Sequence, residues 1–94
     1  KQSAFLVNTG RGELIDESAL AESLRTQHIA GAALDVLSRE PPPREHSLLA
    51  EDIPNLLITP HTAWTSLESR NRLLEGIATN LRTYLAGNPA NRII

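Results

Sequence analysis

The stretch IAGAALDV, residues 29–36, decides the fold of this chain. It is a continuous apolar run of strand length, and its middle consists of glycine and alanine. Because such small side chains contribute little to strand propensity, we expect a packed helix or a ligand to approach this strand closely. Two more short apolar runs, at 4–7 and 56–59, predict further strands. The run at 4–7 has the profile of a strand buried on both faces.

A helix is predicted over residues 16–26, between the first two strands. Its first residue is an aspartate, a favoured N-cap, and Leu20 and Leu24 stack one turn apart. A strand, a helix and a strand within this length predict a right-handed parallel crossover. After the second strand, three consecutive prolines at 41–43 exclude regular structure. We expect a surface excursion there, with at most one helical turn near 47–50.

The last segment carries the clearest helical pattern. Thr65 and Glu68 have the spacing of a capping box, and Gly87 is placed to end the helix. The apolar face of this helix comprises Leu73, Leu74, Ile77, Ala78, Leu81, Tyr84 and Leu85. Such a wide face needs a partner surface. Together the elements predict an α/β fold in the order βαβ-βα, part of a doubly wound, Rossmann-like parallel sheet.

Composition argues against several classes of function. Nine basic and eleven acidic residues give a net charge of −2, without the basic surplus that nucleic-acid binding needs. No apolar run approaches the ~20 residues of a membrane span, and the absence of cysteine fits a reducing compartment. We therefore expect a cytoplasmic protein without nucleic-acid or membrane partners. His28 and His46 lack metal-ligand spacing, so we expect both at the surface and no metal.

Four chemically active residues follow the predicted strands. Arg11 follows the first strand, and Asp35 and Glu40 follow the second. His61 follows the third, and because ligands bind outside the carboxyl ends of parallel strands, we expect all four to converge at one edge. An arginine can bind a carboxylate, a histidine can transfer a proton near neutral pH, and Glu40 can hydrogen-bond the imidazole. Taken singly, a solvated arginine, a turn histidine and a surface glutamate are the more frequent explanations.

The surroundings of these residues add three expectations. Gly10 and Gly12 give Arg11 a permissive backbone. Asp35 stands at the end of an apolar strand, where a buried carboxylate needs partners, and a ligand amide could be one. No G-x-G-x-x-G pattern opens a helix, so the phosphate-binding element of a dinucleotide site is absent from this sequence. The sequence has no methionine and enters an apolar run almost at once, as expected of a piece of something longer.

Three ordered motifs resemble the carboxyl-terminal part of the D-isomer-specific 2-hydroxyacid dehydrogenases. They are VNTGRGELID at 7–16, AGAALDVLSREPPP at 30–43 and NLLITPHTAW at 55–64. The resemblance implies an oxidoreductase that uses NAD or NADP to interconvert a small D-2-hydroxy acid and its 2-oxoacid. Within the family, the EPPP and HTAW stretches are most similar to those of glycerate dehydrogenases, also called hydroxypyruvate reductases.

The resemblance also implies roles for individual residues. Arg11 would orient the substrate carboxylate, and His61, supported by Glu40, would protonate the carbonyl oxygen. Asp35 would contact the nicotinamide carboxamide. The residues implied to line the cofactor are Thr9, Gly10, Arg11, Asp35, His61, Thr62, Ala63 and Trp64.

Members of the family are longer, two-domain proteins. The resemblance implies that residues 1–94 are the carboxyl-terminal part of the NAD-binding domain, with the helix at 65–87 leading toward a substrate domain outside this sequence. It also implies a homodimer for the full-length protein, and an inactive isolated chain. Two alternatives stay open: a cofactor-sensing binding protein, since transcriptional corepressors resembling these dehydrogenases retain the same residues, and an inactive fragment.

Overall fold

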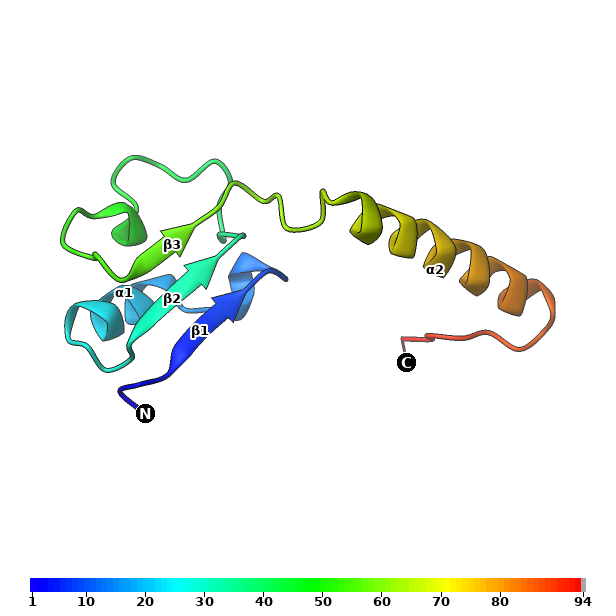
Figure 1. The fold of residues 1–94 in the computed structure, drawn as a ribbon, viewed down its shortest axis with the longest axis horizontal. Helices are drawn as coiled ribbons and strands as arrows, with labels where there is room; N and C mark the ends of the chain where they lie inside the picture. Colours follow the sequence, from blue (N-terminus) through cyan, green and yellow to red (C-terminus); the bar gives the residue numbers. More distant parts are fainter. Residues whose placement is uncertain (94) are drawn as a thin grey trace. The chain divides into compact units, whose positions relative to one another are not determined.

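The computed structural model describes residues 1–93, which fall into two compact units. The first comprises residues 1–63, and the second begins at Trp64. The first unit holds a parallel sheet and a helix, whereas the second is dominated by a single long helix (Figure 1).

The first unit is built on three parallel strands. They are β1 (Phe5–Asn8), β2 (Gly31–Leu34) and β3 (Leu56–Ile58). Figure 1 shows the three arrows side by side in that order and pointing the same way. Asn8 is aligned with Leu34, and Leu34 with Ile58, so the strands finish level with one another. The predicted parallel, Rossmann-like sheet is confirmed, and the loops that follow the strands all leave from one edge.

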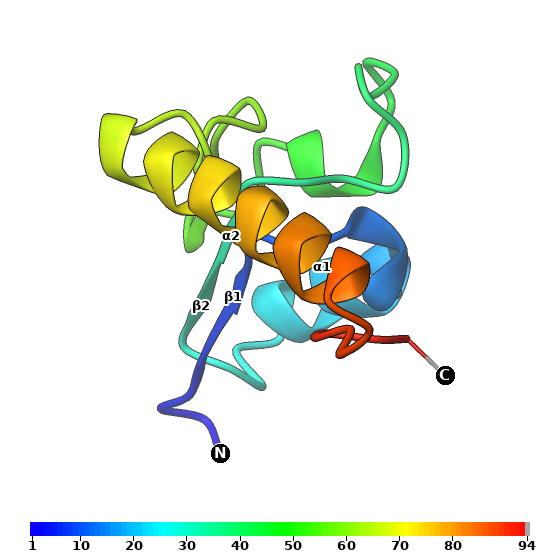
Figure 2. The same cartoon turned by 90° about the vertical axis from the view of Figure 1, so that its right-hand side faces the viewer.

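Helix α1 (Glu17–Arg25) lies against one face of the sheet (Figure 2). It is capped as predicted, because the Asp16 carboxylate accepts a hydrogen bond from the Ala19 N–H at 2.9 Å. Leu20 and Leu24 are buried in the core beneath it. Each leucine side chain that is removed from water in this way contributes about 1.5–3 kcal/mol, so the helix is held mainly by its apolar stripe.

The side chains on the other face of the sheet, away from α1, are apolar but exposed. Phe5 is 75% exposed and Val7 69% exposed, and Leu57 on β3 is also exposed. The prediction that the first strand is buried on both faces is therefore wrong. β1 is an edge strand, and alternate side chains along a strand point to opposite faces. An apolar run has the same pattern whether or not both of its faces are covered, so the sequence could not distinguish the two cases.

The predicted close approach of a helix to β2 is confirmed at Ala32, which is buried in one cluster with Leu20 and Leu24 of α1. At Gly31 the close neighbours are two other segments of the chain. A methyl group on the Gly31 α-carbon would lie 2.8 Å from the carbonyl oxygen of Asn55 and 3.1 Å from the Phe5 ring. The small residue at the start of β2 therefore makes room for the two chain segments on either side of it.

The segment between β2 and β3 contains one turn of 3₁₀ helix, η2 (Ser47–Leu49), as predicted. It is more than a surface excursion, however. Leu48 and Ile53 are buried and belong to the same core cluster as Leu24 of α1. The loop that carries Glu40 is thus anchored in the core at its far end.

The second unit contains helix α2 (Leu67–Leu85). Its N-cap is Ser66, whose hydroxyl oxygen accepts the Ser69 N–H at 3.1 Å, so the predicted cap at Thr65 is one residue too early. The predicted end is confirmed, since Gly87 has a left-handed φ of 77°. None of the residues in α2 is buried. Across residues 1–93, no helix is long and apolar enough to cross a membrane.

Candidate active site

The loop after β1 presents Arg11 by means of an asparagine. Asn8 is buried, its side-chain N–H donates to the Arg11 carbonyl at 2.7 Å, and its side-chain oxygen accepts the Gly10 N–H at 3.0 Å. These two bonds close the turn from both sides, so Asn8 determines where Arg11 stands. No role was predicted for Asn8 from the sequence. An asparagine two residues before a glycine at a strand end, which is typical of an Asx turn, was the available signal.

Gly12 is needed for close contact and not for backbone freedom. Neither Gly10 nor Gly12 has a left-handed φ, so the permissive backbone expected on either side of Arg11 is not used for a left-handed conformation. A methyl group at Gly12 would lie 2.0 Å from the Leu37 carbonyl carbon and 2.2 Å from the Ser38 nitrogen. The loop that carries Arg11 therefore packs directly on the peptide that leads to Glu40.

Glu40 and His61 form a hydrogen-bonded pair. The imidazole Nδ1 lies 2.7 Å from Glu40 Oε2, and the Leu37 N–H donates to Oε1 at 2.9 Å. The bond from His61, and then the bond from Leu37, hold the pKa of the Glu40 carboxyl below its usual value. Glu40 is therefore a carboxylate at neutral pH, and because a carboxylate only accepts, Nδ1 carries the proton of this bond. Both side chains are partly exposed.

Asp35 fixes the loop that contains His61. Its Oδ1 accepts hydrogen bonds from the Thr59 hydroxyl and, at 2.9 Å, from the Thr62 N–H, while Oδ2 accepts the Ala63 N–H at 2.8 Å. The bond from Thr59 lowers the pKa of Asp35 most, and with the bonds from Ala63 and Thr62 it outweighs the opposing effect of burial. The partners expected for this buried carboxylate thus come from the chain itself.

His61 has an unusual backbone conformation. Its φ is 54°, in the left-handed region that non-glycine residues seldom adopt. Its N–H donates to the Thr59 carbonyl at 3.0 Å, which makes a tight turn around Pro60. Residues held in this way persist where their surroundings over-determine them, and here the bonds of Asp35 to the next two peptides do so.

Three hollows lie at this edge of the sheet, and one of about 380 Å³ has Asp35, Glu40 and His61 among its lining residues. The other two are smaller. One of these, of about 190 Å³, is lined among others by Arg11, Glu40 and His61, so the three predicted catalytic side chains share one space. The other, of about 220 Å³, is lined by four of the predicted cofactor residues and by exposed apolar side chains of the sheet. Its lining residues include Thr9, Asp35, Thr62, Ala63, Val7 and Leu57. Gly10 lies in the exposed loop after β1, and Trp64 belongs to the second unit.

The two remaining histidines differ in their surroundings. His28 is exposed, as predicted. The prediction of a surface position for His46 is wrong, because its side chain is only 10% exposed and its Nε2 lies 3.1 Å from Glu17 Oε2. Within residues 1–93, no cluster of three or more candidate ligands could hold a metal ion.

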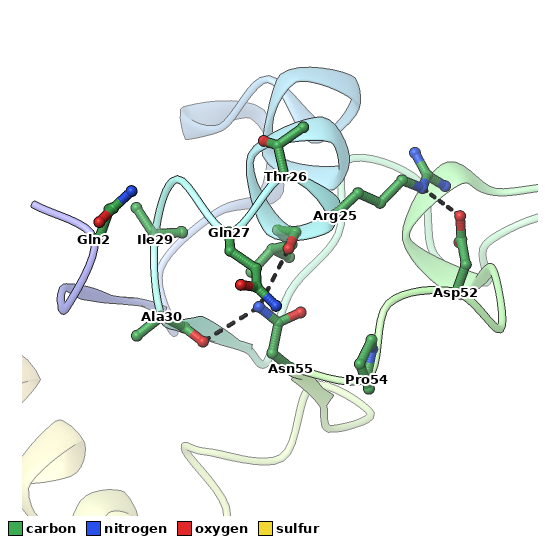
Figure 3. Close-up of a pocket in the computed structure, with 10 residues that line it drawn as sticks. Gln2, Arg25, Thr26, Gln27, Ile29, Ala30, Asp52, Pro54 and Asn55 are labelled. Carbon is green, nitrogen blue, oxygen red and sulfur yellow. Dashed lines mark hydrogen bonds and ion pairs between the residues drawn. The ribbon is translucent and has the colours of Figure 1, made fainter.

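A hollow larger than the three at the carboxyl edge lies at the other end of the strands (Figure 3). It measures about 610 Å³, and Gln2, Ala30 and Asn55, which precede the three strands, are among its lining residues. The ion pair of Arg25 with Asp52, at 2.7 Å, lies beside it. None of the predicted site residues lines this space.

A parallel α/β sheet with its polar groups gathered at the carboxyl edge defines a Rossmann-like nucleotide-binding domain. The family model described as D-isomer specific 2-hydroxyacid dehydrogenase, NAD binding domain, matches residues 1–63. The chain therefore belongs to the D-isomer-specific 2-hydroxyacid dehydrogenase family, as its three motifs indicate.

Three relatives illustrate the match. The glycerate dehydrogenase of Methylorubrum extorquens is 44% identical over 91 residues, which are 97% of this chain and 29% of that protein. The glyoxylate reductase of Thermofilum pendens is 44% identical over 87 residues, 93% of this chain and 25% of that protein. The structure of a D-isomer-specific 2-hydroxyacid dehydrogenase from Xanthobacter autotrophicus, in complex with NADPH and MES, is 38% identical with a TM-score of 0.71, over 99% of this chain and 37% of that one. The chain thus spans less than a third of the length of the two relatives compared by sequence.

Proposed function

We propose that this chain supplies the acid–base side of the active site of an NAD(P)-dependent D-2-hydroxyacid dehydrogenase, an oxidoreductase acting on CH–OH groups. The observation that carries the proposal is the 2.7 Å bond between Glu40 and His61 beside the hollow that Arg11 also lines. An imidazole on a fixed carboxylate, next to a guanidinium, is the arrangement that protonates a carbonyl while holding a neighbouring carboxylate.

Each of the three side chains has a distinct role. The Arg11 guanidinium binds the substrate carboxylate through two parallel N–H donors and so orients the adjacent carbonyl. Because His61 Nδ1 is committed to Glu40, the proton given to the carbonyl oxygen is the one on Nε2. Glu40 stabilises the positively charged imidazolium that donates this proton. In the oxidative direction, His61 accepts the hydroxyl proton instead.

The nicotinamide cofactor, NAD or NADP, supplies or accepts the hydride when it is bound. The hollow of about 220 Å³ would hold the ring end of such a cofactor, because its lining combines the apolar side chains of Val7 and Leu57 with the polar groups of Thr9, Asp35 and Thr62. The proposed cofactor residues are Thr9, Gly10, Arg11, Asp35, His61, Thr62, Ala63 and Trp64. Phosphate binding is assigned to other parts of a longer polypeptide, because these residues contain no glycine fingerprint.

The substrate and the domain organisation of the full-length protein can be proposed as well. The hollow beside Arg11 is small, about 190 Å³, and two relatives are a glycerate dehydrogenase and a glyoxylate reductase. We therefore favour glycerate and hydroxypyruvate, or glyoxylate, as the substrate pair. Residues 1–94 are then the carboxyl-terminal part of the NAD-binding domain, and 65–87 lead toward the substrate domain. We further propose that the full-length protein is a cytoplasmic homodimer.

The test is turnover by the complete polypeptide that carries these residues. Replacing His61 with Ala should lower the reduction of hydroxypyruvate or glyoxylate by NADH or NADPH at least about 100-fold, the usual size of an acid–base contribution. His28→Ala is the matched control, because this histidine is exposed and lines none of the three hollows at the carboxyl edge. Equal turnover in the two variants, or a parent protein inactive on a panel of 2-oxoacids, rejects the assignment.

A further inference from the structure

The loop that carries Glu40 is held at two points by one carboxylate. Glu17, the first residue of α1, accepts the Ser38 N–H at 2.7 Å through Oε1 and the Ser38 hydroxyl through Oε2. The same Oε2 lies 3.1 Å from His46 Nε2. Ser38 stands two residues before Glu40 and His46 stands six after it, so Glu17 fastens the loop on both sides of the predicted catalytic carboxylate.

Two of the three residues in this cluster are largely withdrawn from water, whereas Ser38 is exposed. The side chains of Glu17 and His46 are only 11% and 10% exposed. Burial is the largest single influence on the pKa of Glu17 and would raise it, but the bonds from Ser38 and His46 together lower it below its usual value. The His46 Nδ1 accepts the Leu48 N–H at 3.3 Å, so the ring proton lies on Nε2 and is donated to Glu17. At neutral pH, Glu17 is thus a largely buried carboxylate whose charge is satisfied by three donors, the Ser38 N–H, the Ser38 hydroxyl and His46 Nε2.

A continuous chain of contacts runs from this cluster to His61. Glu17 holds the Leu37–Ser38 peptide. Gly12 packs on this same peptide so closely that there is no room for a methyl group between them. Leu37 in turn donates its N–H to Glu40, and Glu40 binds His61. A displacement of this one peptide would therefore move both the Glu40 carboxylate and the loop of Arg11.

We propose that Glu17 is a positioning residue for the acid–base pair: it fixes the Leu37–Ser38 peptide, which sets the Glu40 carboxylate against His61. This inference rests on the proposed function, since it concerns the same pair. It assigns Glu17 no contact with the substrate or the cofactor. Its effect is on the geometry of proton transfer, where small displacements of a reacting group cost large factors in rate.

The experiment uses the complete polypeptide with Glu17→Gln, which removes the charge and keeps the shape. We expect kcat for 2-oxoacid reduction to fall roughly 10- to 100-fold, with the KM for the cofactor changed less than about twofold. The acidic limb of the kcat/KM profile should also move to higher pH, because Glu40 loses part of the Leu37 bond that lowers its pKa. A role confined to stability would not move this limb.

Two further variants make the test decisive. Glu22→Gln removes a carboxylate from the exposed side of the same helix and should leave both kcat and the pH profile unchanged. Ser38→Ala removes only the hydroxyl bond, so it should give a smaller change of the same kind even if Glu17→Gln does not fold. An active parent whose Glu17→Gln and Ser38→Ala variants match Glu22→Gln overturns this inference alone. A parent without 2-oxoacid reductase activity overturns the proposed function and this inference with it.

Discussion

Single carboxylates at the carboxyl edge of the sheet serve different purposes. Asp35 is 5% exposed and accepts three hydrogen bonds from the chain that follows β3. Glu40 is partly exposed, and its two partners are Leu37 and His61. The first carboxylate shapes a loop, whereas the second remains able to respond to a change of charge on the imidazole.

Gly12 allows the most direct prediction at the scale of one residue. Gly12→Ala forces a methyl group against the Leu37–Ser38 peptide, and overpacking of this kind costs about 1–3 kcal/mol or more because backbone has to move. The free energy of unfolding, measured by urea denaturation of the complete polypeptide, should fall accordingly.

The matched control is Gly76→Ala. Nothing lies within 4 Å of a methyl group at Gly76, which stands inside α2. Because alanine is the better helix former, this change should stabilise the helix by roughly 0.5–1 kcal/mol. If both substitutions shift stability in the same direction, the close contact at Gly12 is not what requires glycine there.

At the scale of elements, the start of α1 has two adjacent acidic residues with separate tasks. Asp16 caps the helix by accepting the Ala19 N–H, and Glu17 reaches across to Ser38. We predict that Asp16→Ala lowers the free energy of unfolding by about 1 kcal/mol, the usual value of such a cap. The control is Ser23→Ala on the same helix, which removes only a bond to the Ala19 carbonyl and improves helix propensity. Thermal or urea unfolding followed by circular dichroism compares the two, and an equal loss from both would argue against the cap.

The elements themselves were largely predictable from the sequence. The strands at 4–7, 29–36 and 56–59 and the helix at 16–26 are found with small changes at their ends. Local patterns determine these elements, since capping residues and apolar spacing act over one or two turns. The start of α2 was misplaced by one residue, because Thr65 and Ser66 are both good N-caps and only the geometry chooses between them.

The contacts between elements were predictable only in part. Parallel topology was enough to predict that Glu40 and His61 lie at one edge, where the structure joins them by a hydrogen bond. The bonds of Glu17 to Ser38 and of Asp35 to Thr62 join residues more than twenty positions apart. No local sequence pattern predicts such bonds. His46 illustrates the difficulty, because a histidine in a polar stretch looks like a surface residue until its partner is known.

On the scale of the whole molecule, acid should destabilise the first unit. The pKa values of Glu17, Asp35, Glu40 and Asp52 all lie below the ordinary values of 4.5 for Glu and 3.8 for Asp. Between those ordinary values and the lower folded values, the unfolded chain binds more protons than the folded one. The stabilisation is therefore complete above about pH 4.5 and is lost as the pH falls through the folded pKa values.

This prediction is checked by urea unfolding of the complete polypeptide at a series of pH values. Glu17→Gln removes one of the four carboxylates, so its stability should depend less steeply on pH below 4.5 than that of the parent. Identical slopes for the variant and the parent would contradict the contribution of Glu17.

The level finish of the three strands has one more consequence. Neighbouring strands lie about 4.8 Å apart. The loops that carry Arg11 and His61 therefore begin about 10 Å apart, at the level ends of β1 and β3. That spacing limits the distance that one small molecule must bridge between the guanidinium and the imidazole. Inserting a residue within β3 would shift the histidine by about 3.3 Å along the strand and turn its side chain to the other face of the sheet. The proline-rich stretch at 41–43 lies outside the strands, so this constraint does not apply to it.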